Sequence, residues 1–158
     1  MSVPADFGAW SARIAELGIE LPPVVAPVAD YVPAVRSGSL VFVSGQVPIV
    51  AGRVVATGKV GGDVGPDEAK QHARTCALNA LAAVHALVGI DSVARVVKVV
   101  GFVASAEGFT GQPAVINGAS ELFVEVFGEA GTHARSAVGV AELPLGVPVE
   151  VELIVEVA

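Results

Sequence analysis

The stretch Thr132–Val157, "THARSAVGVAELPLGVPVEVELIVEV", predicts how the chain ends and which residues face its core. Residues alternate from 149 to 157 with the period of a β-strand that has one buried face. The odd-numbered positions are all Val or Leu and are expected to meet helices. The opposite face carries Glu150, Glu152, Ile154 and Glu156. A second alternating run, 134–140, lies before "LPLGVP", so we expect the two runs to form a hairpin.

The glutamate face of this last strand has two interpretations. A solvated surface is the ordinary one for charged residues on a strand. A cleft or a seam between subunits is the other, and it is favoured by Ile154 in the same row. Apolar residues in the expected partner strand, Ala137, Val138 and Val140, also favour partial burial. The residues alone leave both interpretations open.

Arg135 stands at the head of this segment in a chain with only 9 Lys and Arg residues. An arginine at a strand end can simply pair with a surface acid. Its planar guanidinium is also suited to bidentate binding of a carboxylate, which gives orientation as well as affinity. We therefore treat Arg135 as a candidate carboxylate-binding residue. The nearby His133 is expected to be an ordinary loop residue rather than a contact at the rim of a cleft.

Charge and hydropathy narrow the class of protein. The net charge is −7 and no cluster of Lys and Arg is present, so a nucleic-acid partner is not expected. One or two arginines are enough for a small acidic ligand. The hydrophobic fraction is 53%, yet no run of roughly 18 uncharged apolar residues predicts a membrane span. The excess of apolar residues is expected to lie in an interface between subunits.

Cys76 is the only cysteine, so neither a disulfide within the chain nor a multi-cysteine metal site is expected. We predict no metal and place this thiol in the core. The first residues, "MSVPADFGAWSARIAELG", show no charged and then apolar leader, and a cytoplasmic location is the simplest expectation.

The N-terminal part predicts a short helix and a connector. Asp6 is a candidate helix cap, and Phe7, Trp10, Ile14 and Leu17 form one apolar stripe before Gly18. The following "IELPPVVAPVADYVPAV" holds four prolines and is expected to be extended. We predict a single domain over 1–158, with residues 1–30 as an extension and 31–158 as the core.

The remaining segments predict two strands (39–49 and 52–60), a helix from Pro66 to Gly89, a strand (92–105) and a helix that starts near Pro113. In the strand 92–105, Arg95 and Lys98 are expected on opposite faces because one is odd and the other even. With the last two strands, this order predicts an α+β domain with one sheet and two helices on one face.

Three blocks resemble one known family. They are "YVPAVRSGSLVFVSGQVP" (31–48), "VINGASELFVEVFGE" (115–129) and "ARSAVGVAELPLGVPVEVELIVEV" (134–157), the last being the most specific. In this order they resemble the RidA/YjgF family of reactive imine and enamine deaminases, formerly called L-PSP endoribonucleases. The resemblance implies a chorismate-mutase-like α+β fold with one mixed sheet. It also implies a homotrimer with clefts between neighbouring subunits.

The resemblance implies a reaction and a set of residues. Members hydrolyse 2-imino and enamine acids of the 2-aminoacrylate type to 2-keto acids and ammonia, without a cofactor or metal. By motif, Arg135 would bind the substrate carboxylate and Glu150 would position the attacking water. The residues that would line the cleft are Tyr31, Ser44, Gly45, Asn117 and Ala137.

This chain departs from the family pattern at two places. Ala137 stands where many members have Cys, and the segment before Tyr31 is longer than in compact members. An alternative function is a non-catalytic regulator that binds a small imino or keto acid in the same cleft. The presence of both Arg135 and Glu150 favours the enzyme, because a binder needs only the arginine. RNA cleavage is the weakest alternative because the chain is acidic.

Overall fold

The structure is a computed structural model that describes residues 9–27 and 29–158. The expected cap Asp6 and the stripe residue Phe7 lie outside this range. The helices are α1 (Ala9–Glu16), α2 (Pro66–Val88) and α3 (Gln112–Phe127). The strands are β1 (Ala34–Ser37), β2 (Leu40–Gln46), β3 (Ile49–Val50), β4 (Arg53–Val54), β5 (Val93–Ala104), β6 (Ala134–Val140) and β7 (Val149–Val157). Short 3₁₀ turns occupy Ile90–Ser92, Gly128–Gly131 and Pro144–Gly146.

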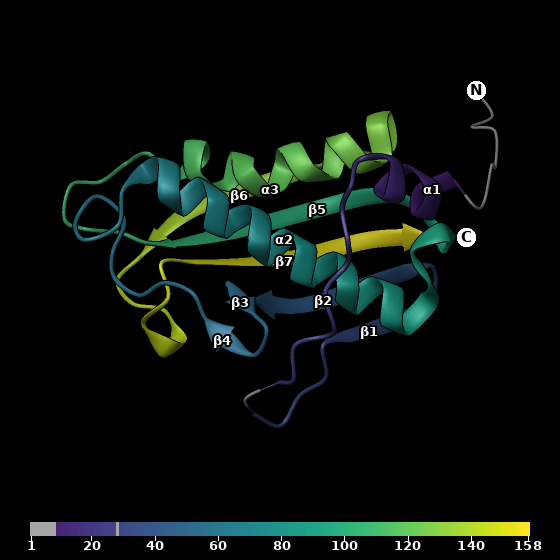
Figure 1. The fold of residues 1–158 in the computed structure, drawn as a ribbon, viewed down its shortest axis with the longest axis horizontal. Helices are drawn as coiled ribbons and strands as arrows, with labels where there is room; N and C mark the ends of the chain where they lie inside the picture. The colour runs from purple at the N-terminus through teal and green to yellow at the C-terminus, as the bar shows by residue number, and fades with distance from the viewer. Residues whose placement is uncertain (1–8, 28) are drawn as a thin grey trace.

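One mixed sheet forms the centre of the molecule, in the strand order β1-β2-β7-β5-β6. β5 and β6 are parallel, and the other neighbouring pairs are antiparallel. Figure 1 shows α2 and α3 running side by side across one face of this sheet. The predicted α+β architecture is therefore confirmed, with two helices on one face and a short N-terminal helix. No helix in the described ranges has the length and apolarity needed to cross a membrane.

The prediction that the last two strands form a hairpin is wrong. β5 lies between β6 and β7 and pairs with both of them. The helix α3 connects β5 to β6, and such a crossover lets the two strands run parallel side by side. The chain then turns back through residues 141–148 and enters the sheet between β5 and β2. The alternation of residues is the same for either neighbour, so the sequence pattern did not distinguish them.

The faces of β7 are as predicted, but those of β5 are not. The odd-numbered residues of β7 are buried, and Glu150, Glu152, Ile154 and Glu156 are half-buried on the open face. On β5, Arg95 pairs with Glu156 and Lys98 with Ile154, so both cations lie on that same open face. The register shifts between 93 and 95 and again between 96 and 98. A bulge adds a residue to one strand and thereby breaks the odd–even rule.

Two smaller strand predictions need correction. Within 52–60 only Arg53–Val54 is a strand, and it pairs with β3 rather than with the main sheet. Gly58 and Gly61 adopt positive φ of 117° and 89°, a conformation that ends an extended strand. In the opposite sense, the expected connector ends in β1, which pairs with β2 along residues 34–37.

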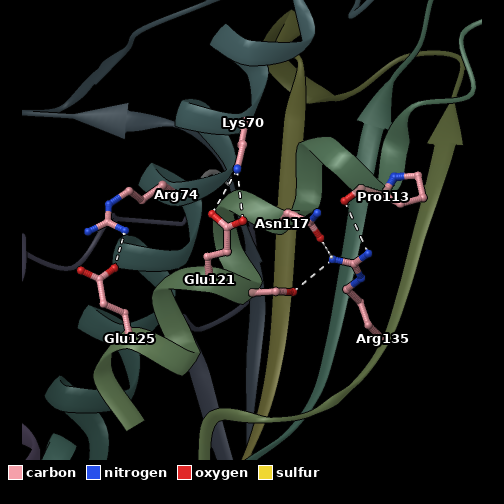
Figure 2. A network of polar contacts seen from close by, with 8 residues as sticks. Lys70, Arg74, Pro113, Asn117, Glu121, Glu125 and Arg135 are labelled. Atoms are coloured by element: carbon pink, nitrogen blue, oxygen red, sulfur yellow. Dashed lines mark hydrogen bonds and ion pairs between the residues drawn. The ribbon is translucent and has the colours of Figure 1, made fainter. Parts of the chain in front are cut away.

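Small residues bring the two long helices close together and onto the sheet. A Cβ at Gly118 of α3 would collide with the Lys70 carbonyl of α2, so this contact needs a glycine. Ion pairs cross between the helices, from Lys70 to Glu121 at 3.1 Å and from Arg74 to Glu125 at 3.0 Å (Figure 2). Cys76 is buried in α2, as predicted, and burial raises the pKa of its thiol.

The short helix α1 belongs to the same hydrophobic core. Ile14 is buried there, and the indole N–H of Trp10 donates to the Val93 carbonyl at 2.8 Å. The Trp10 ring also meets Phe127 edge-on at 5.2 Å. The stripe predicted from Trp10, Ile14 and Leu17 is thus the packing face of this helix. From α1 the connector leads to the β1 side of the sheet (Figure 1).

Candidate functional site

The predicted site residues fall into two groups on opposite faces of the sheet. Arg135 is registered with Val99, which is buried beneath the helices, and its side chain contacts α3. Glu150 is registered with Phe102 and alternates with buried residues, so it lies on the open face. A complete site that uses both residues therefore requires surfaces from two chains, or a different conformation of a single chain.

The first group, which we call the Arg135 half-site, consists of Arg135, Asn117, Ser120, His133 and Ala137. Figure 2 shows the guanidinium reaching from β6 to Asn117 and Pro113 of α3. Arg135 Nη1 donates to Asn117 Oδ1 at 2.8 Å and to Ser120 Oγ at 3.2 Å, and Nη2 donates to the Pro113 carbonyl at 3.4 Å. All three acceptors are neutral. Within residues 9–27 and 29–158 the guanidinium forms no ion pair, so its charge is oriented but not neutralised.

Ser120 and His133 extend this network behind Arg135. Ser120 Oγ lies 2.8 Å from His133 Nε2, and His133 Nδ1 lies 2.6 Å from the Gly131 carbonyl. A carbonyl can only accept, so in the neutral ring Nδ1 carries the hydrogen and Nε2 accepts from the Ser120 hydroxyl. Ser120 Oγ then accepts from Arg135. The ring of His133 is also fixed edge-on against Phe123 at 5.9 Å.

The sequence analysis assigned no role in the site to these two residues. Ser120 follows Asn117 by three positions, so it lies on the same face of a helix, and this spacing was an available signal. His133 was expected to be an ordinary loop residue, and the structure makes it a support for Ser120 instead. Ala137 is the next residue on the same side of β6 and packs against the core.

The second group, the Glu150 half-site, consists of Glu150, Tyr31, Ser44 and Gly45 with the residues of one cavity. The cavity has a volume of about 370 Å³, and Glu150, Tyr31 and Gly45 are among its lining residues. A Cβ on Gly45 would collide with Glu150 Oε1, so the close approach of the carboxylate requires glycine at this position. The "SGQ" motif therefore makes room for Glu150.

The carboxyl of Glu150 is in an unfavourable environment for its charge. Burial raises the pKa of Glu150 above its usual value, and the negative charge of Glu152 raises it further. In the described part of the chain no side-chain hydrogen bond or ion pair stabilises this carboxylate. A half-buried, unpaired carboxylate beside a cavity is typical of a functional position.

Ser44 positions its neighbours rather than lining the cavity. Its hydroxyl donates to the Val32 carbonyl at 2.6 Å, and its backbone N–H donates to the Pro33 carbonyl at 2.9 Å. These bonds hold the segment that carries Tyr31 against β2. The phenol ring is left 46% exposed at the cavity. In the described ranges, no group of three or more His, Cys, Asp and Glu side chains is arranged to hold a metal ion.

The cavity also has walls formed by residues outside the predicted site set. One comes from the connector and consists of Val25, Ala26, Pro27 and Ala29. Another comes from the turn before β7 and consists of Pro144 and Leu145. The connector shows no periodicity, so its sequence did not indicate which face of the molecule it would cover.

Comparisons with known proteins found a matching family and several relatives. Residues 23–157 match the profile of a family described as Endoribonuclease L-PSP. Protein TCP17 of Trypanosoma cruzi is 46% identical over 158 residues, which cover 99% of this chain and 98% of that protein. A putative endoribonuclease of Shewanella oneidensis has a TM-score of 0.90 at 30% identity, over 95% of this chain and 100% of that chain.

Two further solved structures are similar to this chain. RidA from the Antarctic bacterium Psychrobacter sp. has a TM-score of 0.62 at 30% identity, over 85% of this chain and 94% of that chain. TdcF of E. coli, solved with bound serine, has a TM-score of 0.62 at 26% identity, over 87% of this chain and 94% of that chain.

Proposed function

Because the chain belongs to the RidA/YjgF family, described as Endoribonuclease L-PSP, we propose that it is a cytoplasmic deaminase of reactive imines. Its substrates are 2-imino and enamine acids of the 2-aminoacrylate type, and its products are 2-keto acids and ammonia. The observation that supports this most directly is the guanidinium of Arg135, which is oriented by three neutral oxygens. Such a cation is ready to bind the carboxylate of a small acid. The serine bound to TdcF carries a carboxylate of this kind.

We propose further that the active form is a homotrimer. In it the Arg135 half-site of one subunit faces the Glu150 half-site of its neighbour, which unites the two groups that one chain keeps apart. The open face of the sheet supports this assembly, because Phe42 and Val138 leave 43% and 44% of their surfaces exposed there. Apolar side chains on an uncovered sheet face favour association with another copy.

The chemistry needs little more than these two groups. An imine carbon is electrophilic, and binding of the carboxylate by Arg135 fixes its position relative to water. Glu150 accepts a proton from the attacking water, whose oxygen bonds to the imine carbon. Glu150 returns this proton to the nitrogen, and the proton of the added hydroxyl follows as the carbon–nitrogen bond breaks. Ammonia then leaves, and the hydroxyl oxygen becomes the carbonyl of the 2-keto acid. A raised pKa makes Glu150 a better base near neutral pH.

The test is hydrolysis of 2-iminopropanoate, generated from alanine by an amino-acid oxidase. We expect the wild-type protein to accelerate hydrolysis and Arg135→Ala to abolish the acceleration. Arg53→Ala is the matched control, because Arg53 is an exposed arginine in the β3–β4 hairpin outside both half-sites. If the wild-type protein binds 2-keto acids tightly but hydrolyses no imine, the regulatory function would replace the deaminase proposal. Cleavage of RNA would favour the ribonuclease function instead, which the net charge of −7 makes unexpected.

The trimer has its own test. Arg135→Ala and Glu150→Gln each inactivate one half-site, so either homotrimer should be inactive. If the site is shared between subunits, co-expression of the two variants should restore about a quarter of wild-type activity by random mixing in a cyclic trimer. No recovery in mixed trimers of confirmed mass would contradict a site shared between chains.

A further inference from the structure

The cavity beside Glu150 is polar at one end and apolar along its walls. Glu150 and the phenol of Tyr31 provide the polar groups. The apolar lining comes from Val25, Ala26, Pro27, Ala29, Val47, Ile49, Pro144 and Leu145. These residues belong to three separate segments: the connector, the β2–β3 junction and the turn before β7. Their convergence gives a pocket that can hold an apolar group next to a carboxylate.

Leu145 is the most unusual of these residues. Its backbone has φ of 62° and ψ of 10°, the left-handed conformation, and its side chain is 52% exposed. A left-handed conformation is strained for a non-glycine residue, and Asn or Asp would adopt it with less strain. In the isolated chain this leucine is therefore only partly buried. An apolar ligand in the cavity would give its side chain a contact.

The volume of the cavity indicates which side chains it can hold. Since the carboxylate is bound by Arg135 of the neighbouring subunit in the proposed trimer, the cavity has to accommodate mainly the side chain. At the ~30 Å³ that one water molecule occupies for each non-hydrogen atom, a methyl group fills less than a tenth of the 370 Å³ available. An apolar side chain of four non-hydrogen atoms occupies about 120 Å³ on the same basis, so it fits and can contact more of the apolar walls than a methyl group can.

We propose that the cavity binds the side chain of the substrate and selects 2-imino acids with apolar side chains of four or so heavy atoms, such as those derived from leucine or methionine. This inference rests on the proposed deaminase function and adds the substrate class to it. The connector and Leu145 act as specificity walls of this cavity. Glu150 remains at the polar end, next to the reacting carbon.

The first experiment compares substrates. An amino-acid oxidase generates the imines of alanine, leucine and methionine in turn, and kcat/KM is measured for each with the wild-type trimer. We expect the leucine and methionine imines to exceed the alanine imine by at least about tenfold, since each buried CH₂ contributes ~0.8 kcal/mol. Equal values, or a preference for the alanine imine, would overturn the inference and leave the deaminase function intact. Hydrolysis of none of them would overturn the deaminase function itself.

The second experiment changes the walls. Leu145→Asn keeps a residue that tolerates positive φ while it removes the apolar contact. We expect the ratio of kcat/KM for the leucine imine over the alanine imine to fall about tenfold. Val25→Ser tests the connector wall in the same way. Leu87→Asn is the control, because Leu87 is 46% exposed on α2 and does not line the cavity.

A binding measurement gives a readout separate from catalysis. Calorimetry of the product 2-keto acids should show tighter binding of 4-methyl-2-oxopentanoate than of pyruvate, with a more negative heat capacity change from apolar burial. Leu145→Asn should reduce this difference. If Leu145→Asn and Val25→Ser both keep the wild-type ratio of affinities for the two 2-keto acids, these walls do not determine side-chain specificity.

Discussion

The two half-sites are built in opposite ways, although each holds one charged group. Around Arg135, three neutral oxygens and a supporting Ser120–His133 pair satisfy the donors of the cation and fix its direction. Around Glu150, the cavity walls are largely apolar and a second carboxylate lies nearby, so the charged form is disfavoured. This contrast supports the division of labour that we propose, in which one half-site binds an anion and the other accepts a proton.

The two half-sites also differ in how their charged groups affect the stability of the folded chain. The cation at position 135 keeps its hydrogen bonds, so the isolated chain loses little by holding it there. The carboxylate at position 150 loses water without gaining a partner, which is costly for a charged group. Perturbed groups of this kind concentrate at functional sites because chemistry requires them there.

The largest expected effect comes from removing the proposed base, Glu150. Glu150→Gln keeps the shape of the side chain but cannot accept the proton, so kcat should fall by roughly 10²–10⁴-fold while KM changes little. Steady-state kinetics with the imine of leucine or alanine measures both parameters. Glu142→Gln is the matched control, because Glu142 pairs with Lys59 on the surface. A rise in KM with an unchanged kcat would assign Glu150 to binding and remove the division of labour.

The sequence predicted much of the fold for a simple reason. Periodicity reports which residues face a core, and the odd-numbered residues of β7 and the apolar faces of α2 and α3 followed it. Periodicity does not report neighbours, so the position of β5 between β6 and β7 was missed. It also assumes an unbroken strand, and the bulges in β5 placed Arg95 and Lys98 on one face.

The site was predictable only in part, for a related reason. Motifs indicated Arg135, Asn117 and Glu150, but a motif does not predict on which face of the sheet each side chain lies. The separation of Arg135 from Glu150 follows from the register, which places β5 between their strands and turns the two side chains to opposite faces. Supporting residues were harder still: Ser120 shows its role only when His133, distant by thirteen positions, closes the network.

A smaller effect is expected from weakening the binding half-site. Ser120→Ala removes the hydroxyl that accepts from Arg135, and a hydrogen bond to a charged group is worth about 1.5–3 kcal/mol. We expect KM for the imine to rise about tenfold or more, with a minor change in kcat. Ser120→Thr keeps the hydroxyl and should recover most of the affinity.

Ser136→Ala is the control for this prediction, since Ser136 is exposed on the opposite face of β6 from Arg135. The imidazole nitrogens of His133 provide a spectroscopic check, because nitrogen NMR distinguishes the two neutral tautomers. The hydrogen should reside on Nδ1 in the wild-type protein. An unchanged KM in Ser120→Ala would mean that Asn117 and the Pro113 carbonyl orient the guanidinium without Ser120.

The smallest effect is a change in stability at the other half-site. The pKa of Glu150 is raised in the folded state, so the folded chain binds the proton more tightly than the unfolded chain. Its carboxyl therefore contributes most favourably below the unfolded value near 4.5, and that contribution is lost as pH rises through the raised pKa. At pH 7, Glu150→Gln should consequently unfold at a higher urea concentration than the wild type. The advantage should disappear as pH approaches 4.5.

Glu142→Gln should show no such gain at pH 7, because that carboxylate is exposed and paired. Protein concentration must be held constant, since assembly also adds to apparent stability. A Glu150→Gln variant less stable than the wild type at pH 7 would mean that this carboxylate has a stabilising partner in the assembled protein, and the contrast between the two half-sites would then be a property of the isolated chain alone.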